Sequence, residues 1–219
     1  MAVSMPRQDG MVDDGECWRC SARVGVSPAC GTCEAPQALP SGADHFTTLG
    51  LTRSLVVDLA DLERRYHEAS RLVHPDRHQI GEPTAARISI ETSAAVNRAY
   101  RTLRDPLARG RYWLELHGQS LAENNNRVPP TLAALVFDVQ EQLEDLRGRS
   151  ENADLRRQVE AARTAVAADF EGRLGELGEC YDRWQSDATP PVLAELKERL
   201  SEIAYLRTLL ADVDEGLER

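Results

Sequence analysis

Apolar residues spaced three and four apart fill most of the chain after residue 40, and this spacing constrains the fold more than any other feature. Side chains at these intervals line one face of an α-helix. The last segment holds three such runs, and Pro129-Pro130 and Pro190-Pro191 precede the first and the third. The first run carries Leu132, Val136, Val139, Leu143 and Leu146. Three amphipathic helices with short connections predict a three-helix bundle.

The middle segment has the same character. One predicted helix carries Leu59, Leu62, Tyr66, Ala69 and Val73, and another carries Val96, Ala99, Tyr100 and Leu103. His74-Pro75 should end the first of these helices, because the residue before a proline avoids the helical region. Asp105 and Pro106 predict the cap and first turn of a further helix. "DHFTTLGL" predicts a short helix packed on the pair, so the chain is expected to be all-α.

Charge and hydropathy limit the class of protein. Charged residues make up 28% of the 219 residues, and no run of ~18 apolar residues could span a membrane. The first sixteen residues carry more acids than bases and lack the apolar centre of a signal peptide, which favours a cytoplasmic protein. The net charge of -10 argues against a nucleic-acid partner, because phosphate binding needs an excess of Lys and Arg.

Four of the five cysteines form two C-x2-C pairs near the N-terminus, and they are Cys17, Cys20, Cys30 and Cys33. Each pair can place two thiolates on one side of a tight turn, and four thiolates suit one structural zinc ion. Gly25 and Gly31 fit the sharp turns that such a knob needs. Two redox pairs or an iron–sulfur site are the alternatives. The lone Cys180 is expected to be a small buried hydrophobe.

The tripeptide His74-Pro75-Asp76 offers an imidazole and a carboxylate between two predicted helices. A catalytic role would need a nucleophile or a pocket, and the surrounding sequence supplies neither. A proline-stiffened, exposed turn suits recognition better than chemistry. An ordinary surface loop remains the plain alternative.

The surroundings of the tripeptide resemble the J-domain, the module that activates DnaK-type chaperones. "YHEASRLVHPDRH", a helix and "NRAYRTLRDP" carry the resemblance, which covers residues 44 to about 117. It implies a chaperone-binding site made of His74, Pro75, Asp76, Arg64, Arg65, Tyr66 and Arg71. Members of the family often have Lys or Arg directly after the tyrosine at position 66, where this chain has His67 and Glu68. They often have Tyr directly before the tripeptide, where this chain has Val73. The predicted helix therefore has few basic residues, mostly Arg64, Arg65 and Arg71, which implies a dedicated chaperone partner.

The whole architecture resembles the HscB family of iron–sulfur cluster co-chaperones, in the variant with N-terminal C-x2-C pairs. The resemblance implies an HscA-like DnaK-type chaperone and an IscU-like iron–sulfur scaffold protein as partners. It also implies a client-binding patch on the bundle. Phe137, Asp138, Glu141 and Asp145 form one stripe beside the apolar seam, and Tyr205 lies on the last helix. The alternative for Phe137 is that it widens the core stripe.

The expected organisation is a tail and zinc-binding knob over 1–40, a J-domain over 43–118 and a three-helix bundle over 119–219. The expected function is that of a co-chaperone without enzymatic activity of its own, which stimulates the chaperone's ATP hydrolysis and delivers the scaffold protein to it. Three alternatives stay open: a J-domain co-chaperone for another client, a zinc-dependent nucleic-acid regulator, and a thiol oxidoreductase using Cys17 and Cys20.

Overall fold

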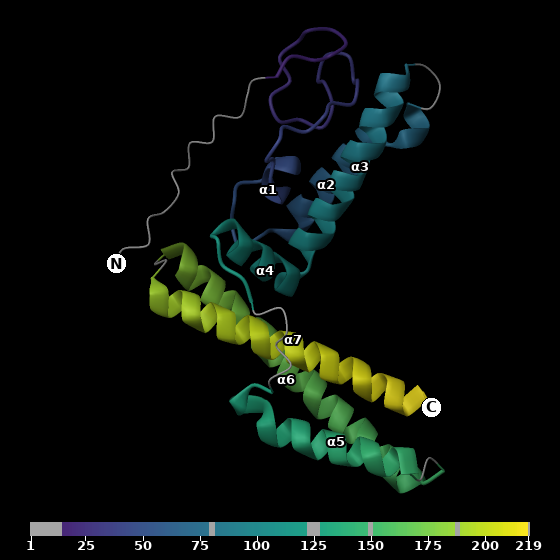
Figure 1. The fold of residues 1–219 in the computed structure, drawn as a ribbon, viewed down its shortest axis with the longest axis vertical. Coiled ribbons are helices and arrows are strands. Elements are labelled where there is room, and N and C mark those ends of the chain that lie inside the picture. The colour runs from purple at the N-terminus through teal and green to yellow at the C-terminus, as the bar shows by residue number, and fades with distance from the viewer. Residues whose placement is uncertain (1–14, 79–81, 122–127, 149–150, 187–188, 219) are drawn as a thin grey trace. The chain divides into compact units, whose positions relative to one another are not determined.

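The structure, a computed structural model, describes residues 15–78, 82–121, 128–148, 151–186 and 189–218. Its helices are α1 (His45–Thr48), α2 (Leu59–Val73), α3 (Pro83–Arg104), α4 (Pro106–Leu116), α5 (Ala133–Gly148), α6 (Ala153–Ser186) and α7 (Pro190–Glu218) (Figure 1). Short 3-10 turns, η1 (Pro75–Arg77) and η2 (Pro130–Leu132), precede α3 and α5. No strand occurs in the described ranges, so the prediction of an all-α chain is confirmed.

The first sixteen residues, from which the absence of a signal peptide was predicted, lie almost entirely outside the described residues. Among the helices that the structure describes, none combines the length and the apolar character needed to cross a membrane.

The chain divides into two compact units, Met1–Arg109 and Gly110–Arg219. In the first unit α2 and α3 form a helical hairpin, and α1 packs against α3. The hairpin buries most of the apolar face predicted from its spacing, with Leu62, Val73, Val96 and Leu103 inaccessible to solvent. Leu59 departs from the prediction: it is the first residue of α2 and is 52% exposed. Asp58 begins α2 by accepting hydrogen bonds from the amides of the next turn.

Asp44 holds α1 in place at the edge of this unit. Its carboxylate accepts the amide of Thr47 over 2.6 Å and pairs with the guanidinium of Arg53. Burial opposes ionisation of Asp44, but the Thr47 amide and hydroxyl and the Arg53 guanidinium outweigh it and lower the pKa of the carboxyl. The helix is therefore fixed by an N-cap that is also an ion pair.

The second unit contains the predicted three-helix bundle of α5, α6 and α7. The apolar seam of α5 is buried as predicted, and it packs against residues of the other two helices. The buried core of the bundle is Leu132, Val136, Val139, Leu143, Leu146, Val159, Val166, Leu206, Leu209 and Val213. The helix α7 contributes Leu206, Leu209 and Val213 to this core.

The second half of α4 packs on α6 and α7 at a glycine. A Cβ added at Gly110 would lie 2.3 Å from the hydroxyl of Tyr181 and 2.5 Å from a methyl group of Leu200. A larger side chain therefore fits only if the side chains of Tyr181 and Leu200 move. Asp105 begins α4 as predicted, because its carboxylate accepts the amide of Ala108 over 2.7 Å.

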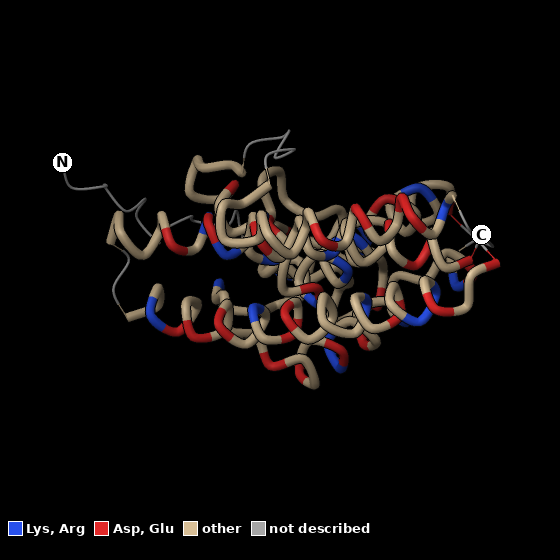
Figure 2. Tube along the Cα trace, turned by 90° about the horizontal axis from the view of Figure 1, so that it is seen from below, with Lys and Arg blue, Asp and Glu red and all other residues tan. Residues whose placement is uncertain are grey.

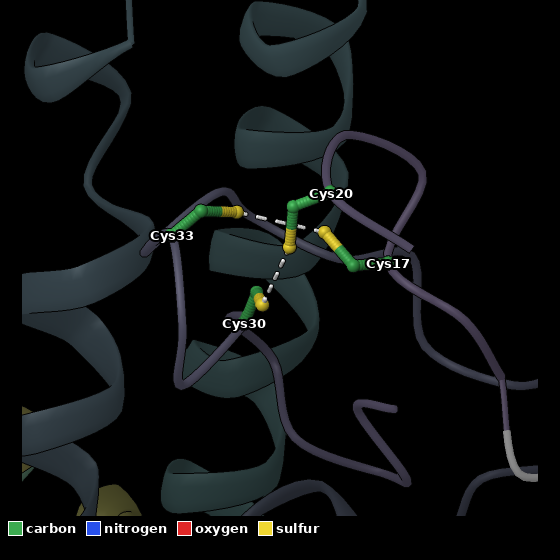
Figure 3. A group of neighbouring side chains, drawn as sticks. All are labelled: Cys17, Cys20, Cys30 and Cys33. Carbon is green, nitrogen blue, oxygen red and sulfur yellow. Dashed lines mark hydrogen bonds between the residues drawn. The ribbon is translucent and has the colours of Figure 1, made fainter. Parts of the chain in front are cut away.

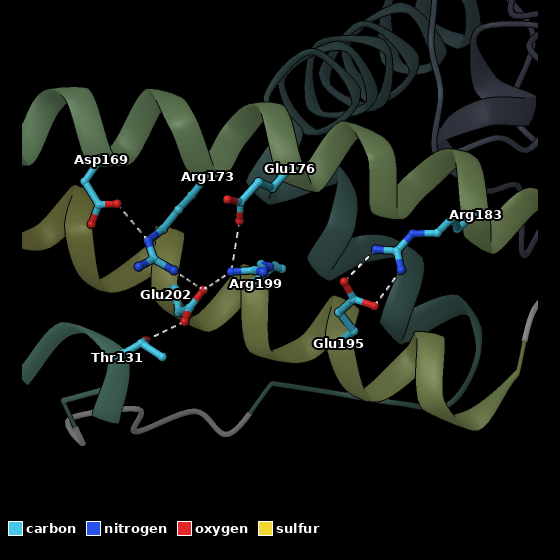
Figure 4. Close-up of polar contacts among 8 residues, drawn as sticks. All are labelled: Thr131, Asp169, Arg173, Glu176, Arg183, Glu195, Arg199 and Glu202. Atoms are coloured by element: carbon cyan, nitrogen blue, oxygen red, sulfur yellow. Dashed lines mark hydrogen bonds and ion pairs between the residues drawn. The ribbon is translucent and has the colours of Figure 1, made fainter.

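A buried carboxylate lies inside the bundle, where an apolar residue would be expected. Glu202 of α7 is 1% exposed. It accepts hydrogen bonds from Thr131 before α5, from Arg173 of α6 and from Arg199 of its own helix (Figure 4). The neighbouring pair of Arg183 and Glu195 lies nearer the solvent. Each oxygen of Glu202 thus has a partner, which is the condition for burying a charge.

Candidate functional site

The His-Pro-Asp tripeptide forms the turn between α2 and α3. Val73 is the last residue of α2, and the 3-10 turn begins at Pro75. The ring Nδ1 of His74 accepts the amide of Asp76 over 3.3 Å, which fixes the imidazole against the turn. Side chains of His74 and Asp76 are 52% and 75% exposed. The turn therefore presents both polar groups to solvent on a stiff backbone.

The basic residues of α2 have different surroundings. Arg64 pairs with Asp61 and Glu68, and Arg65 pairs with Asp61 and donates to the carbonyl of Gly50. Intrahelical acids thus neutralise both arginines. Arg71 is exposed and forms no side-chain ion pair or hydrogen bond with the described part of the chain. Arg71 is therefore the basic group of α2 that stays available for an acidic partner.

Tyr66, the remaining residue predicted to bind the chaperone, packs between the two helices of the hairpin. Its ring stacks on that of Tyr100 with centroids 4.0 Å apart. Its hydroxyl donates to the side-chain oxygen of Asn97 over 2.9 Å. In this structure Tyr66 stabilises the hairpin that carries the turn.

The knob, residues 15–40, is built from two turns with the same hydrogen bonds. The amide of Cys17 donates to Ala22, and the amide of Cys30 donates to Ala35. The amide of Ser21 donates to the carbonyl of Cys17, and the amide of Glu34 donates to the carbonyl of Cys30. The two C-x2-C pairs therefore form equivalent turns that face each other.

The four cysteine sulfurs converge between these turns (Figure 3). All lie within 4.8 Å of one another. The sulfurs of Cys17 and Cys33 are 3.6 Å apart and those of Cys20 and Cys30 are 3.7 Å apart. A tetrahedral ion with metal–sulfur bonds of ~2.3 Å needs sulfurs ~3.8 Å apart. Since each contact joins one pair to the other, the arrangement fits one shared metal ion better than two independent redox pairs.

Backbone amides around the cluster favour thiolates, which are the form that binds a metal. The amides of Cys33 and Thr32 lower the pKa of Cys30 to about 6. At Cys20 the amide of Ala22 also favours the thiolate, but the Cys33 thiol and burial outweigh it and raise the pKa to about 12. Burial works against the Cys17 thiolate, but the amides of Arg19 and Cys20 outweigh it and lower the pKa of Cys17. The side-chain amide of Gln37 also donates to the Cys17 sulfur, over 3.3 Å. In metal sites, the ligand atoms commonly form hydrogen bonds with surrounding groups, and these N–H groups are placed to do so for the sulfurs.

The turn residues differ in part from the sequence prediction. Gly25 has a left-handed backbone with φ 59°, as a sharp turn requires, whereas Gly31 does not. The left-handed positions that follow the two C-x2-C pairs are held by Ser21 (φ 57°) and Glu34 (φ 56°). Gly31 lies within the second turn, as predicted, but the left-handed position of that turn falls three residues later, at Glu34.

The predicted client stripe lies on the solvent side of α5. Phe137 is 69% exposed, so its ring does not widen the core. Asp138, Glu141 and Asp145 are exposed on the same side. None of these three acids forms an ion pair or hydrogen bond with the residues that the structure describes. An exposed aromatic ring among unpaired acids is typical of a binding surface.

Tyr205 on α7 is partly buried and packs against the bundle core. The structure therefore places its ring, at least in part, among the apolar side chains rather than wholly at the surface.

Charged residues of both signs are distributed along the described helices. Lys and Arg are interspersed with Asp and Glu (Figure 2). Within the part of the chain that the structure describes, this mixture of bases and acids does not favour the binding of phosphate groups.

Three further residues at these sites were missed by sequence reasoning: Gln37, Glu34 and Arg77. Gln37 looks like part of a linker, yet it is buried and contacts the Cys17 sulfur. Arg77, directly after the tripeptide, forms an ion pair with Glu34 of the knob at 3.2 Å. The two partners are far apart in sequence, so no local pattern could have indicated the pair.

The fold and the exposed His-Pro-Asp turn between two antiparallel helices define a J-domain protein. Searching the chain against models of protein families gave no match. Individual proteins do match. The "Co-chaperone protein HscB homolog" of Bordetella pertussis is 32% identical over 138 residues, which are 62% of this chain and 81% of that protein. The chain belongs to the HscB family of co-chaperones.

Two mammalian relatives carry the name "Iron-sulfur cluster co-chaperone protein HscB". The mouse protein is 31% identical over 67% of this chain, and the human protein is 39% identical over 50% of it. The matched regions span 64% and 48% of those two proteins, so less than two thirds of either.

Solved structures agree with this family. The crystal structure of human HscB superposes with a TM-score of 0.72 and 26% identity, covering 92% of this chain and 98% of that one. HscB from Vibrio cholerae superposes with a TM-score of 0.62 over 78% of this chain and 96% of that one. At 22% identity the second likeness concerns the fold alone.

Proposed function

We propose that this chain is a co-chaperone of iron–sulfur cluster assembly that stimulates ATP hydrolysis by a dedicated DnaK-type chaperone and delivers an iron–sulfur scaffold protein to it. The observation that carries the proposal is the exposed His74-Pro75-Asp76 turn on the α2–α3 hairpin of an HscB-family chain. The two mammalian relatives are named as iron–sulfur cluster co-chaperones. The chain itself acts by binding and not by catalysis.

The chaperone contact consists of the turn and of Arg71. A stiff turn loses little entropy when it docks, so its polar groups can be recognised at low cost. With Arg64 and Arg65 paired internally, the basic surface of α2 is small. A chaperone that depends on a strongly basic α2 would bind this chain weakly, which supports a dedicated partner.

The scaffold contact is the α5 stripe of Phe137 with Asp138, Glu141 and Asp145, with Tyr205 on α7 as a further contact. The exposed ring provides the apolar anchor, and the unpaired acids would meet basic groups of the scaffold protein. This assignment rests on the exposure of Phe137 and on the lack of partners for the acids among the residues that the structure describes.

Zinc is the proposed ion of the cysteine cluster, held by Cys17, Cys20, Cys30 and Cys33. Four thiolates in a closed site are the usual ligands of structural zinc. The cytoplasm is the proposed place of action, because thiols stay reduced there and available for a metal.

Steady-state ATPase rates of the cognate chaperone test the central proposal. His74→Gln should abolish stimulation while the helical content stays unchanged. His67→Gln is the matched control, since His67 is an exposed histidine of α2 that pairs with Glu63 and lies beside the ring of Tyr66. Stimulation by His74→Gln equal to that of the wild type would overturn the proposal.

A further inference from the structure

A buried hydrogen-bond path connects the cysteine cluster to α3. The side-chain amide of Gln37 donates to the Cys17 sulfur over 3.3 Å, and the backbone carbonyl of Gln37 accepts the hydroxyl of Thr92 over 2.9 Å. Gln37 is 6% exposed and Thr92 is 2% exposed. The knob is therefore packed onto the helical hairpin through a residue that also touches a metal-ligand sulfur.

A second connection joins the knob to the His-Pro-Asp turn. The carboxylate of Glu34 pairs with one guanidinium nitrogen of Arg77 at 3.2 Å. Another nitrogen of Arg77 donates to the carbonyl of Arg71 in the last turn of α2, over 3.1 Å. Arg77, the residue directly after Asp76, thus links the end of α2 to the knob.

The position of Glu34 depends on the cysteine turn. Glu34 directly follows Cys33, adopts a left-handed backbone and donates its amide to the carbonyl of Cys30 over 2.9 Å. Any loosening of that turn changes the direction in which the Glu34 side chain leaves the knob. The geometry of the metal-binding turn therefore determines whether Glu34 can reach Arg77.

We propose that the knob is a brace for the His-Pro-Asp turn, in which Glu34 is a positioning residue that acts through Arg77 and metal binding keeps the brace in place. This proposal rests on the proposed function only for the role of the turn in chaperone binding. Whether the knob orders the turn can be measured on this chain without a chaperone.

Metal binding should matter more than the ion pair. The knob buries few side chains, among them Cys17, Cys30 and Ala35. A core this small does not hold a fold without a metal or a disulfide. Loss of the metal should remove both the Gln37–Thr92 and the Glu34–Arg77 contacts. Loss of Glu34 removes one exposed ion pair, whose contribution is modest.

Amide hydrogen exchange on the full chain, followed residue by residue by NMR, tests the brace without any chaperone. The amides of Arg77 and His78 donate within the turn to His74 and Pro75, so they report its order. Chelation of the metal should speed exchange at both amides by more than tenfold. Glu34→Gln should speed it by about two- to five-fold at unchanged metal content, as expected for one exposed pair.

Two further variants make the test specific. Glu91→Gln removes an exposed ion pair with Arg87 on α3, and it should leave the turn amides unchanged. Exchanging the charges with Glu34→Arg and Arg77→Glu together should restore part of the protection. In the ATPase assay Glu34→Gln should raise the concentration for half-maximal stimulation by about two- to five-fold and leave the maximal rate unchanged.

Unchanged exchange at Arg77 and His78 after both chelation and Glu34→Gln would overturn the brace, whatever the ATPase result. If exchange responds as expected but the wild-type chain stimulates no chaperone, the brace stands and the proposed function fails. Equal acceleration by Glu34→Gln and Glu91→Gln would also overturn the brace, because it would show a general loss of stability.

Discussion

Thr131, just before α5, donates its hydroxyl over 2.5 Å to the buried carboxylate of Glu202 on α7. The same carboxylate pairs with Arg173 of α6, so one side chain connects α6, α7 and the turn that leads into α5. Removing one partner of a buried ion pair leaves the other charge buried and uncompensated, which costs free energy. Loss of the Glu202 carboxylate should therefore destabilise the whole bundle.

Glu202→Ala should lower the free energy of unfolding of the bundle by about 3–5 kcal/mol, because Arg173 would keep a largely buried charge without its main partner. Urea unfolding followed by circular dichroism measures this loss. Glu195→Ala is the control on the same helix, since its pair with Arg183 is more exposed and should contribute less than ~1 kcal/mol. Equal losses in the two variants would contradict a special role for Glu202.

Phe137→Ala should weaken binding of the iron–sulfur scaffold protein by more than ~2 kcal/mol, or roughly thirty-fold, and barely change the melting temperature. The reason is that its ring is exposed and contributes little to the core. Leu143→Ala, a buried residue of the same helix, should instead cost about 2–5 kcal/mol of stability. Calorimetry of binding and of melting on the same samples separates these effects. A large fall in melting temperature with unchanged affinity would place the client site elsewhere.

Cys33→Ser should lower the zinc content and unfold the knob, while the bundle of the second unit stays folded. Three thiolates leave the tetrahedral site open, and structural zinc sites need all four ligands. Metal analysis after dialysis gives the content, and NMR spectra show which residues lose order. Cys180→Ser is the control, because Cys180 is buried in α6 and is not one of the four clustered thiols. Full zinc occupancy in Cys33→Ser would count against the assigned ligand set.

The stability of the first unit should depend on the ionisation of Asp44. Because the folded state lowers the pKa of this carboxyl, its stabilisation is present above the unfolded pKa of about 4 and disappears as the pH falls through the lower folded value. Asp44→Asn should therefore cost about 1–2 kcal/mol at pH 7, and the cost should shrink below about pH 4.

Native-state hydrogen exchange of the α2 and α3 amides at several pH values measures that dependence. Asp58→Asn is the matched variant, because Asp58 is an exposed cap for which Asn is an equally good replacement. A pH-independent effect of Asp44→Asn would show that packing, and not charge, holds this position.

Much of the fold follows from local sequence. The three- and four-residue spacing of Leu62, Val73, Val139 and their neighbours predicted helices that the structure contains, because the buried stripe of a helix repeats with its turn. The cysteine spacing likewise predicted a four-sulfur cluster, since two C-x2-C turns leave few other arrangements. Both signals act within a few residues of the chain.

Contacts between distant residues were not predictable in this way. Glu202 looks like one more acid of a solvated helix face, and only Arg173 and Thr131, from other elements, make its burial possible. Glu34 and Arg77 are separated by the whole of α1 and α2. Pairing across such distances depends on how the elements pack, and the amino-acid pattern around either residue carries no sign of it.

The two turns of the knob share one backbone geometry. Every backbone bond that shapes the first turn recurs in the second with both residue numbers raised by thirteen: Cys17 to Ala22 matches Cys30 to Ala35, and the bridge of Glu16 with Arg23 matches that of Ala29 with Pro36. The knob therefore has an internal pseudosymmetry, in which two turns of one backbone geometry each contribute half of the site. One turn alone carries two thiols and cannot enclose an ion, so the closed site needs both halves. The halves differ at the position after the second cysteine, where one has Ser21 and the other has Glu34.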